Sequence, residues 1–255
     1  MAEGTASLGG RRVLVMGASS GIGRAVAVAA TRAGARVAMA ARRLDRLREV
    51  ASEAGGDAWP TQCDVRIPMA CDLTVRATVH ELGGLDTLVY ATGISRLALL
   101  TETDQACWRE LLETNLVGAA LLTRAALPAL AEVRGRVAFL SSDSVARPFP
   151  GLGAYAASKA GLDALVAAWR TEVREVTFTR VVVGPTHTGM ADDWDAQLAS
   201  AMFEWWQSIG YLDHPVVEPE WVAARLVDWM AADEPPEEVD LLAEAIAERA
   251  GRSGG

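Results

Sequence analysis

A glycine-rich turn between an apolar strand and an apolar helix constrains the fold of this sequence more than any other feature. The run Arg12-Val-Leu-Val-Met16 has the composition of a buried strand, Gly17-Ala-Ser-Ser-Gly21-Ile-Gly23 follows it, and a helical run begins at Arg24. A second apolar strand, 36–41, comes at the spacing of a βαβ unit. Glycines let the backbone approach a ligand, and a helix start offers free N–H groups to a pyrophosphate. The position of the glycines between a strand and a helix of a βαβ unit predicts dinucleotide binding rather than a merely structural turn.

Strands and helices alternate along the rest of the chain. Further strands are expected at 59–65, 85–93, 135–141, 179–184 and 239–242, and helices at 68–82, 104–130, 153–176 and 218–231. This alternation predicts one α/β domain, a Rossmann-like doubly wound parallel sheet of about seven strands with helices on both faces. The domain is expected to span 11–245, between a flexible N-terminus, 1–10, and a flexible tail, 246–255.

A hydroxyl, a phenol and an amine stand at fixed spacing between a strand end and a helix. Ser142 follows the strand at 135–141, and Tyr155 and Lys159 are four residues apart, on one face of the next helix. An ammonium beside a phenol favours its ionised form, so Lys159 is expected to lower the pKa of Tyr155 and fit it for proton transfer. By itself the pair is weak, because Tyr-x-x-x-Lys occurs by chance in many helices.

Asn115 and the three histidines are the other polar residues that could have a functional role. Asn115 interrupts the apolar pattern of the helix at 104–130, which indicates a specific hydrogen bond or a partner across a helix interface. His80, His187 and His214 are each more typical of structural residues, and no metal-ligand cluster is present in the sequence.

The end of the second strand predicts which dinucleotide binds. An acidic residue there would hold the ribose of NAD, but the sequence reads Ala40-Ala41-Arg42-Arg43. Guanidinium groups suit a 2′-phosphate, so NADP(H) is expected and NAD is less favoured, with Arg42 the first candidate and Arg43 the second. Asp64 is a candidate for the adenine amino group, or else a helix cap.

Composition limits the partners. A net charge of −9 argues against nucleic acid and anionic membranes, and 51% hydrophobic residues can bury a large core. The sequence has no signal-peptide core, and its three cysteines form no C-x-x-C pair, so a cytoplasmic protein with reduced thiols is expected. The aromatic stretch 189–214 is either a mobile lid over an apolar pocket or an element packed into the core or a subunit contact.

These motifs, in this order, resemble the short-chain dehydrogenase/reductase family, in its shorter NADP-preferring branch, from about residue 11 to 242. The resemblance implies a catalytic tetrad in which Tyr155 is the general acid/base, Ser142 positions the substrate oxygen, Lys159 lowers the tyrosine pKa and holds the ribose, and Asn115 anchors a proton-relaying water. It also implies a set of cofactor-binding residues: Gly17, Ser19, Ser20, Gly21, Ile22, Gly23, Asp64, Val65, Ala91, Thr92, Gly93, Gly184, Thr186 and Thr188. Tyr155 and Lys159 belong to that set too, and family members commonly form tetramers through the two long helices.

Three positions depart from the family pattern. Met16 stands where threonine is usual, the stretch Tyr90-Ala91-Thr92-Gly93 where Asn-Asn-Ala-Gly is usual, and Val183-Gly184 where Pro-Gly is usual. The main hypothesis is therefore an NADP(H)-dependent oxidoreductase acting on a hydrophobic carbonyl or alcohol, as a homotetramer or homodimer. The alternatives are a catalytically weak cofactor-binding sensor or scaffold and, less favoured, redox-assisted epimerisation or dehydration.

Overall fold

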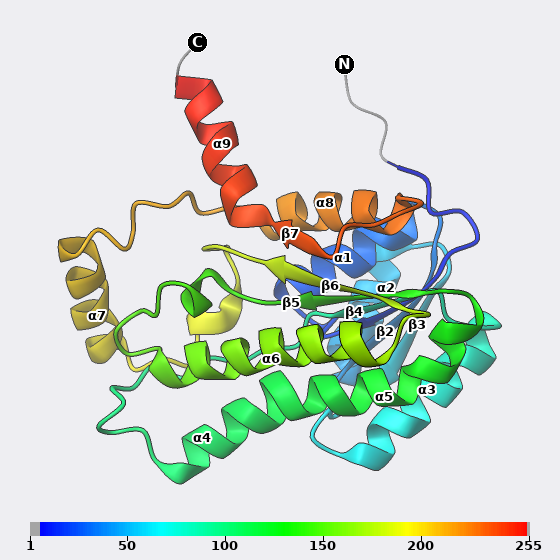
Figure 1. The fold of residues 1–255 in the computed structure, drawn as a ribbon, viewed down its shortest axis with the longest axis horizontal. Coiled ribbons are helices and arrows are strands. Elements are labelled where there is room, and N and C mark those ends of the chain that lie inside the picture. Colours follow the sequence, from blue (N-terminus) through cyan, green and yellow to red (C-terminus); the bar gives the residue numbers. More distant parts are fainter. Residues whose placement is uncertain (1–5, 254–255) are drawn as a thin grey trace.

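The computed structural model describes residues 6–253, which form a single parallel sheet covered by helices on both faces (Figure 1). The sheet order is β3-β2-β1-β4-β5-β6-β7, with a crossover between β1 and β4. Its strands are β1 (Arg12–Met16), β2 (Arg36–Ala41), β3 (Ala58–Gln62), β4 (Thr87–Tyr90), β5 (Arg136–Leu140), β6 (Thr177–Val182) and β7 (Glu238–Asp240). The predicted doubly wound fold is confirmed. Because the central strands β1, β2, β4 and β5 are buried on both faces, they are runs of apolar residues and not alternating ones.

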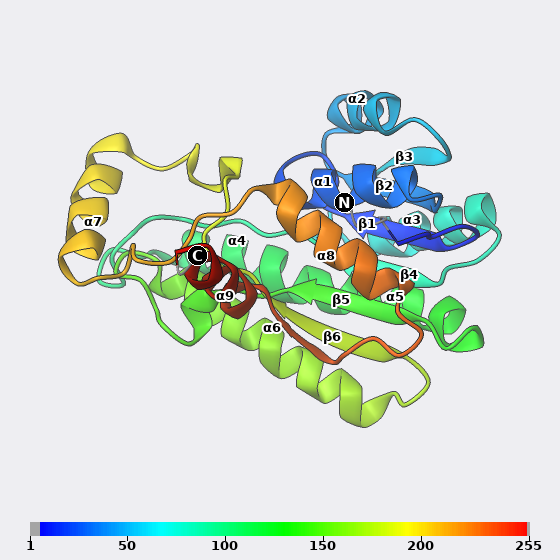
Figure 2. The ribbon, with the colours of Figure 1, turned by 90° about the horizontal axis from the view of Figure 1, so that it is seen from above.

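Two hydrophobic cores lie on either side of this sheet. On one face pack α1 (Gly21–Arg32), α2 (Leu44–Ala54) and α8 (Pro219–Ala231), and on the other α3 (Pro68–Leu82), α5 (Gly118–Glu132) and α6 (Gly153–Glu172), as Figure 2 shows from above. The remaining long helices are α4 (Gln105–Leu112), α7 (Ala196–Ser208) and α9 (Leu241–Ser253). A π-helical turn, Glu113–Val117, joins α4 to α5.

The segment 105–132 is long and apolar enough to cross a membrane by length and composition, with 44% of its most apolar window buried. In the fold its helices contact α3 and α6, as a core helix does. The rest of that window is half-buried or exposed in a single chain.

Both ends of the predicted domain needed correction. Residues 1–5 lie outside the described part of the chain, but Leu8 is fully buried and its N–H donates to Ala33 O at 2.8 Å, so the flexible start does not extend to residue 10. The predicted tail from 246 is helical as far as Ser253, because alanine, glutamate and arginine, which are strong helix formers, make up five of the eight residues 246–253. The last strand also ends sooner than predicted, at Asp240.

Candidate active site

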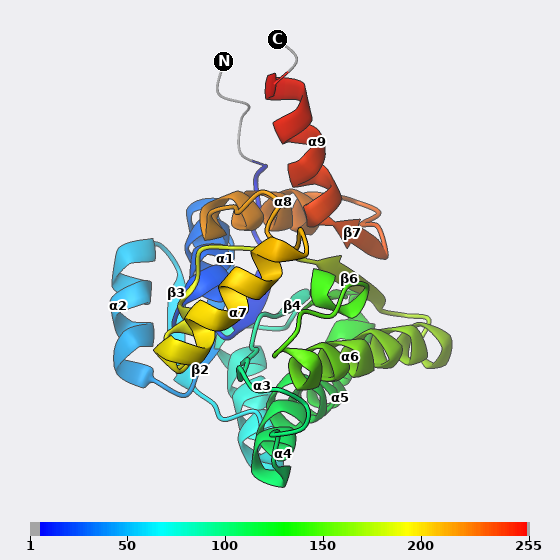
Figure 3. The ribbon, with the colours of Figure 1, turned by 90° about the vertical axis from the view of Figure 1, so that its left-hand side faces the viewer.

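The predicted functional residues gather at the edge where β1, β4, β5 and β6 end. Parallel strands bring their carboxyl ends to one side of the sheet, and α7 lies across that side (Figure 3). Gly17, Gly93, Ser142 and Gly184 follow these four strands, one after each. Residues up to 167 positions apart in the sequence thereby lie at one edge of the sheet.

The glycine turn is packed so closely that two of its glycines admit no side chain. Gly17 has φ 95°, and a Cβ there would lie 2.8 Å from Thr92 N; a Cβ on Gly23 would lie 2.3 Å from Gly17 O. A third glycine, Gly21, faces the loop after β6, because a Cβ on it would come within 3.3 Å of Thr188 Cγ2. Glycine is required here because β1, β4 and α1 approach one another too closely for a side chain to fit between them.

The start of α1 is open to an anion. Ser20 precedes its first residue in an extended conformation, and no side chain accepts from the first N–H groups of the helix. A pocket of about 490 Å³ adjoins this end and is lined by Gly21, Arg24, His187, Thr188, Gly189, Asp192, Pro219 and Glu220. Free N–H groups and the positive end of the helix dipole suit the pyrophosphate of a dinucleotide.

The two arginines after β2 lie differently from each other. Arg43 reaches the glycine turn, where its Nη2 is 3.3 Å from Ser19 Oγ and 3.2 Å from Ser20 Oγ. Arg42 is exposed, and its carbonyl accepts from Gln62 Nε2 at 2.9 Å. The geometry therefore puts Arg43 closer to the turn, although sequence reasoning ranked Arg42 first.

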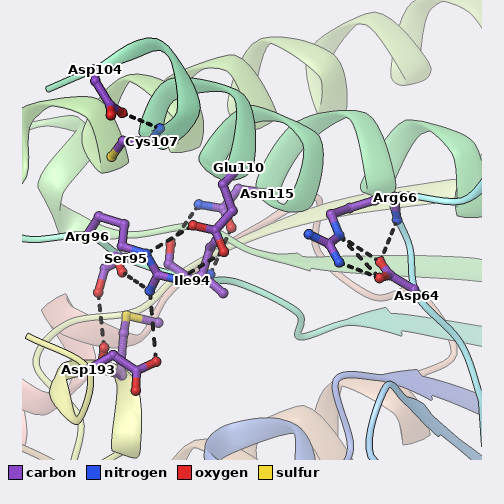
Figure 4. A network of polar contacts seen from close by, with 11 residues as sticks. Asp64, Arg66, Ile94, Ser95, Arg96, Asp104, Cys107, Glu110, Asn115 and Asp193 are labelled. Atoms are coloured by element: carbon purple, nitrogen blue, oxygen red, sulfur yellow. Dashed lines mark hydrogen bonds and ion pairs between the residues drawn. The ribbon is translucent and has the colours of Figure 1, made fainter.

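Asp64 is engaged in an ion pair. Its carboxylate accepts two hydrogen bonds from Arg66 Nε and one from Nη2, the last at 2.6 Å, and this pairing lowers the pKa of Asp64 (Figure 4). Val65 beside it is buried. The adenine contact of both residues stays a prediction.

Asn115 is fully buried within the π-helical turn and ties three segments together. Its Oδ1 accepts from Ile94 N, and its Nδ2 donates to Ile94 O and to Ser158 Oγ, each at 2.9 Å (Figure 4). Ser158 Oγ in turn donates to Tyr155 O at 2.7 Å. The Asn115 side chain thus pairs with both the N–H and the carbonyl of Ile94, in the loop after β4, as the backbone of a neighbouring strand would. This specific bonding was expected from the sequence; the π-helical geometry was not.

The unusual tyrosine after Val89 is accommodated by a glycine. Tyr90 is fully buried, and its hydroxyl donates to Thr114 O at 2.6 Å, inside the π-helical turn. A Cβ on Gly118 would lie 2.8 Å from that hydroxyl oxygen, so Gly118 leaves the room that the phenol needs. Tyr90 therefore supports the position of Asn115.

Ser142, Tyr155 and Lys159 meet at the end of β5, all three buried. Lys159 Nζ donates to Leu140 O at 2.6 Å and lies 5.9 Å from the centroid of the Tyr155 ring. A Cβ on Gly93 would be 3.3 Å from the same Nζ, so the ammonium also faces the loop after β4. Burial lowers the pKa of Lys159 to about 8.

The expected fall in the pKa of Tyr155 is not what this geometry gives. Burial is the main cause that raises that pKa to about 12; the nearby Asp143 carboxylate also raises it, and a hydrogen bond with Ser142 acts in the other direction. The prediction counted the favourable charge of Lys159 and left out desolvation, which disfavours a tyrosinate in a dry site.

Asp143 was missed by the sequence reasoning, although it stands next to Ser142. The Ser142 hydroxyl lies 3.1 Å from Asp143 Oδ1 and also accepts from Ser144 Oγ at 2.9 Å. Burial raises the pKa of Asp143, and His214 acts against that rise. Its adjacency to a candidate catalytic residue was the signal that could have revealed it.

The aromatic stretch 189–214 is anchored to the loop before α6. The rings of Phe149 and Trp206 meet edge to face at 5.3 Å, and those of Phe149 and Tyr211 at 5.1 Å. Trp206 Nε1 donates to Pro150 O at 2.8 Å, and Trp194 Nε1 to Ser95 Oγ at 3.1 Å. The structure therefore favours a packed element over the site, although motion of α7 stays a prediction.

A model of the family described as short chain dehydrogenase matches residues 11–199. The chain belongs to this family. This short-chain dehydrogenase is 37% identical over 198 residues to a glycine betaine reductase of Emericella nidulans; the match covers 74% of this chain and 16% of that protein. A 3-oxoacyl-[acyl-carrier-protein] reductase of Bos taurus is 36% identical over 187 residues, which cover 72% of this chain and 79% of the relative.

Solved structures agree with this assignment. A dehydrogenase/reductase from Sinorhizobium meliloti superimposes with a TM-score of 0.76 at 32% identity, over 92% of this chain and 96% of the other. Members of the family are oxidoreductases that act on hydroxyl or carbonyl groups with a nicotinamide cofactor.

Proposed function

We propose that this protein is an NADP(H)-dependent oxidoreductase that interconverts a carbonyl compound and its alcohol, with Tyr155 as the general acid/base. One observation carries the proposal: a buried serine, tyrosine and lysine stand at the same sheet edge as the uncapped start of α1. A nicotinamide cofactor fits the residues present, because the start of α1 lacks a side-chain cap and adjoins a pocket of about 490 Å³.

Bound NADP(H) supplies or accepts the hydride at the substrate carbon. The chain supplies the proton: during reduction Tyr155 Oη donates to the substrate oxygen, and during oxidation it takes that proton back. Ser142 Oγ donates a hydrogen bond to the same oxygen. Lys159, with its low pKa and its amine beside Gly93, is suited to hold the ribose and to return a proton to the tyrosine.

The NADP(H) preference rests on charge. No carboxylate follows β2 until Asp45, whereas Arg42 and Arg43 stand there and Arg43 reaches the glycine turn. Guanidinium groups bind a phosphate bidentately, which favours the 2′-phosphate of NADP(H).

The test is cofactor oxidation with a panel of aldehydes and ketones. The wild type should consume NADPH with some of them, and Tyr155→Phe should lose at least about a thousandfold in kcat while still quenching its tryptophan fluorescence on NADPH binding. Binding of NADPH without turnover of any member of the panel would reject the proposal.

A sensor or scaffold of the same fold is the second candidate. It is favoured by the raised pKa of Tyr155 and by the substitutions at Met16, Tyr90 and Val183. If it is right, Tyr155→Phe leaves the cellular role of the protein intact.

We also infer a cytoplasmic homo-oligomer joined through 105–132 and α6. The inference is supported by the apolar window of 105–132, of which a single chain buries only 44%. Light scattering coupled to size-exclusion chromatography would measure a dimer or tetramer mass.

A further inference from the structure

Asp143 is a partly buried carboxylate at the reacting end of the site, without an arginine or lysine partner among residues 6–253. Its Oδ1 is 3.1 Å from the Ser142 hydroxyl, and its backbone N–H donates to Val183 O at 3.1 Å, so its position is fixed from β6. Among residues 6–253, no arginine or lysine forms an ion pair with it. A carboxylate in such a place is costly unless a charge or a set of donors offsets it.

The groups that face Asp143 offset its burial only in part. Ser142 and Ser144 are neutral and Tyr155 is a weak acid; His214 acts to lower the pKa of Asp143, but burial keeps that pKa raised. Arg147, one turn further on, is engaged elsewhere: it donates to Gly210 O at 2.6 Å and stacks on the Tyr211 ring at 3.6 Å.

The negative charge of Asp143 also opposes the reaction of a neutral substrate. It raises the pKa of Tyr155, and it disfavours the negative charge that develops on the substrate oxygen beside Ser142. A cation on the substrate would cancel both effects. The flanking segments provide apolar surface for the substituents of such a cation, at Phe149 and Trp206, whose rings meet edge to face at 5.3 Å; the Tyr211 ring is already covered by Arg147.

We propose that Asp143 determines substrate specificity, by receiving an ammonium group with apolar substituents, carried one or two bonds from the reacting carbon. This inference rests on the proposed function. A substrate oxygen bound to Ser142 Oγ at about 2.8 Å lies next to the carboxylate, so a cation on the adjoining carbon comes within about 4–6 Å of it. A substrate carboxylate or phosphate at that position would be repelled.

The experiment compares two aldehydes of the same shape. Trimethylammonioacetaldehyde and tert-butylacetaldehyde differ only in a positively charged nitrogen in place of a carbon, and both are assayed with NADPH as the reductant. The wild type should favour the cationic aldehyde in kcat/KM by at least about tenfold. Asp143→Asn should shrink this ratio by about tenfold, whereas Glu204→Gln, which removes the same charge from the exposed face of α7, should leave it unchanged.

A binding measurement separates this inference from the proposed function. In the presence of NADP, choline and its neutral isostere neohexyl alcohol are titrated against tryptophan fluorescence in the wild type and in Asp143→Asn. Tighter binding of choline in the wild type, lost in the variant, supports the inference even if no aldehyde turns over and the proposed reaction fails. Equal affinity for the two alcohols, or an aldehyde ratio that Asp143→Asn does not change, overturns it.

Discussion

Replacement of the buried Lys159 by methionine should remove the activity and stabilise the folded chain. Burial lowers the pKa of this lysine from 10.5 to about 8. At 1.36 kcal/mol for each pKa unit, holding the charged amine inside the fold costs about 3 kcal/mol at neutral pH. The variant also loses the hydrogen bond to Leu140 O, which destabilises it by about 1 kcal/mol. The folded state of Lys159→Met should therefore be more stable than that of the wild type at pH 7 by about 2 kcal/mol.

The sign of the pH dependence follows from the same values. Between about pH 8 and pH 10 the unfolded chain keeps its lysine proton while the folded chain has released it, so the unfolded state binds more protons. The free energy of unfolding attributable to Lys159 therefore rises with pH across this window. Tyr155 acts in the opposite sense only above about pH 10, because its pKa is raised.

Two assays can measure these effects without interference from other amines. Lys159 is the only lysine in the sequence, so isotope-labelled lysine gives one side-chain NMR signal, whose titration midpoint is the pKa. Urea unfolding followed by tryptophan fluorescence at several pH values, for the wild type and Lys159→Met, gives the stability difference. A midpoint at or above the ordinary value, or stability curves that run parallel with pH, would refute the reasoning.

Three further substitutions test the cofactor side of the site. Gly17→Ala should cost more than about 2 kcal/mol of stability and weaken NADPH binding, whereas Gly55→Ala, at a similarly positive φ in open space, should cost only about 1 kcal/mol; thermal unfolding and fluorescence titration measure both. Arg43→Ala should raise the Kd for NADPH at least about tenfold and leave the Kd for NADH unchanged. A larger effect of Arg42→Ala would show that Arg42 is the main ligand of the 2′-phosphate, as the sequence predicted. Asn115→Ala removes three hydrogen bonds from a fully buried site and should lower the free energy of unfolding by about 2–4 kcal/mol; a urea midpoint equal to that of the wild type would contradict this.

The fold and the location of the site could be predicted because both depend on short-range patterns. Buried parallel strands appear in the sequence as apolar runs, and a strand followed by glycine and a helix needs no distant partner to be recognised. Once the strands are parallel, their carboxyl ends lie along one edge of the sheet, and Ser142 and Gly17 both fall at that edge. Asn115 was found for a related reason, as a polar residue in an apolar pattern.

The electrostatics and the local irregularities could not be predicted in the same way. The pKa of Tyr155 depends on how much water the fold removes, which no spacing of residues gives. Asp143 and His214 are 71 positions apart in the sequence and meet only through the packing of the 209–218 loop. The room that Gly118 leaves for Tyr90 is likewise a property of two elements in contact.

The π-helical turn at Glu113–Val117 makes this part of the chain sensitive to its length rather than to its composition. Such a turn holds one residue more than an α-helix needs, and it is the widened turn that presents Asn115 to Ile94. Deletion of one residue there should let α4 and α5 join as a continuous α-helix, which closes every backbone bond and is easier to form. Loss of a single codon would thus yield a protein that folds well and keeps its tyrosine and lysine, but has lost the amide that holds the loop after β4.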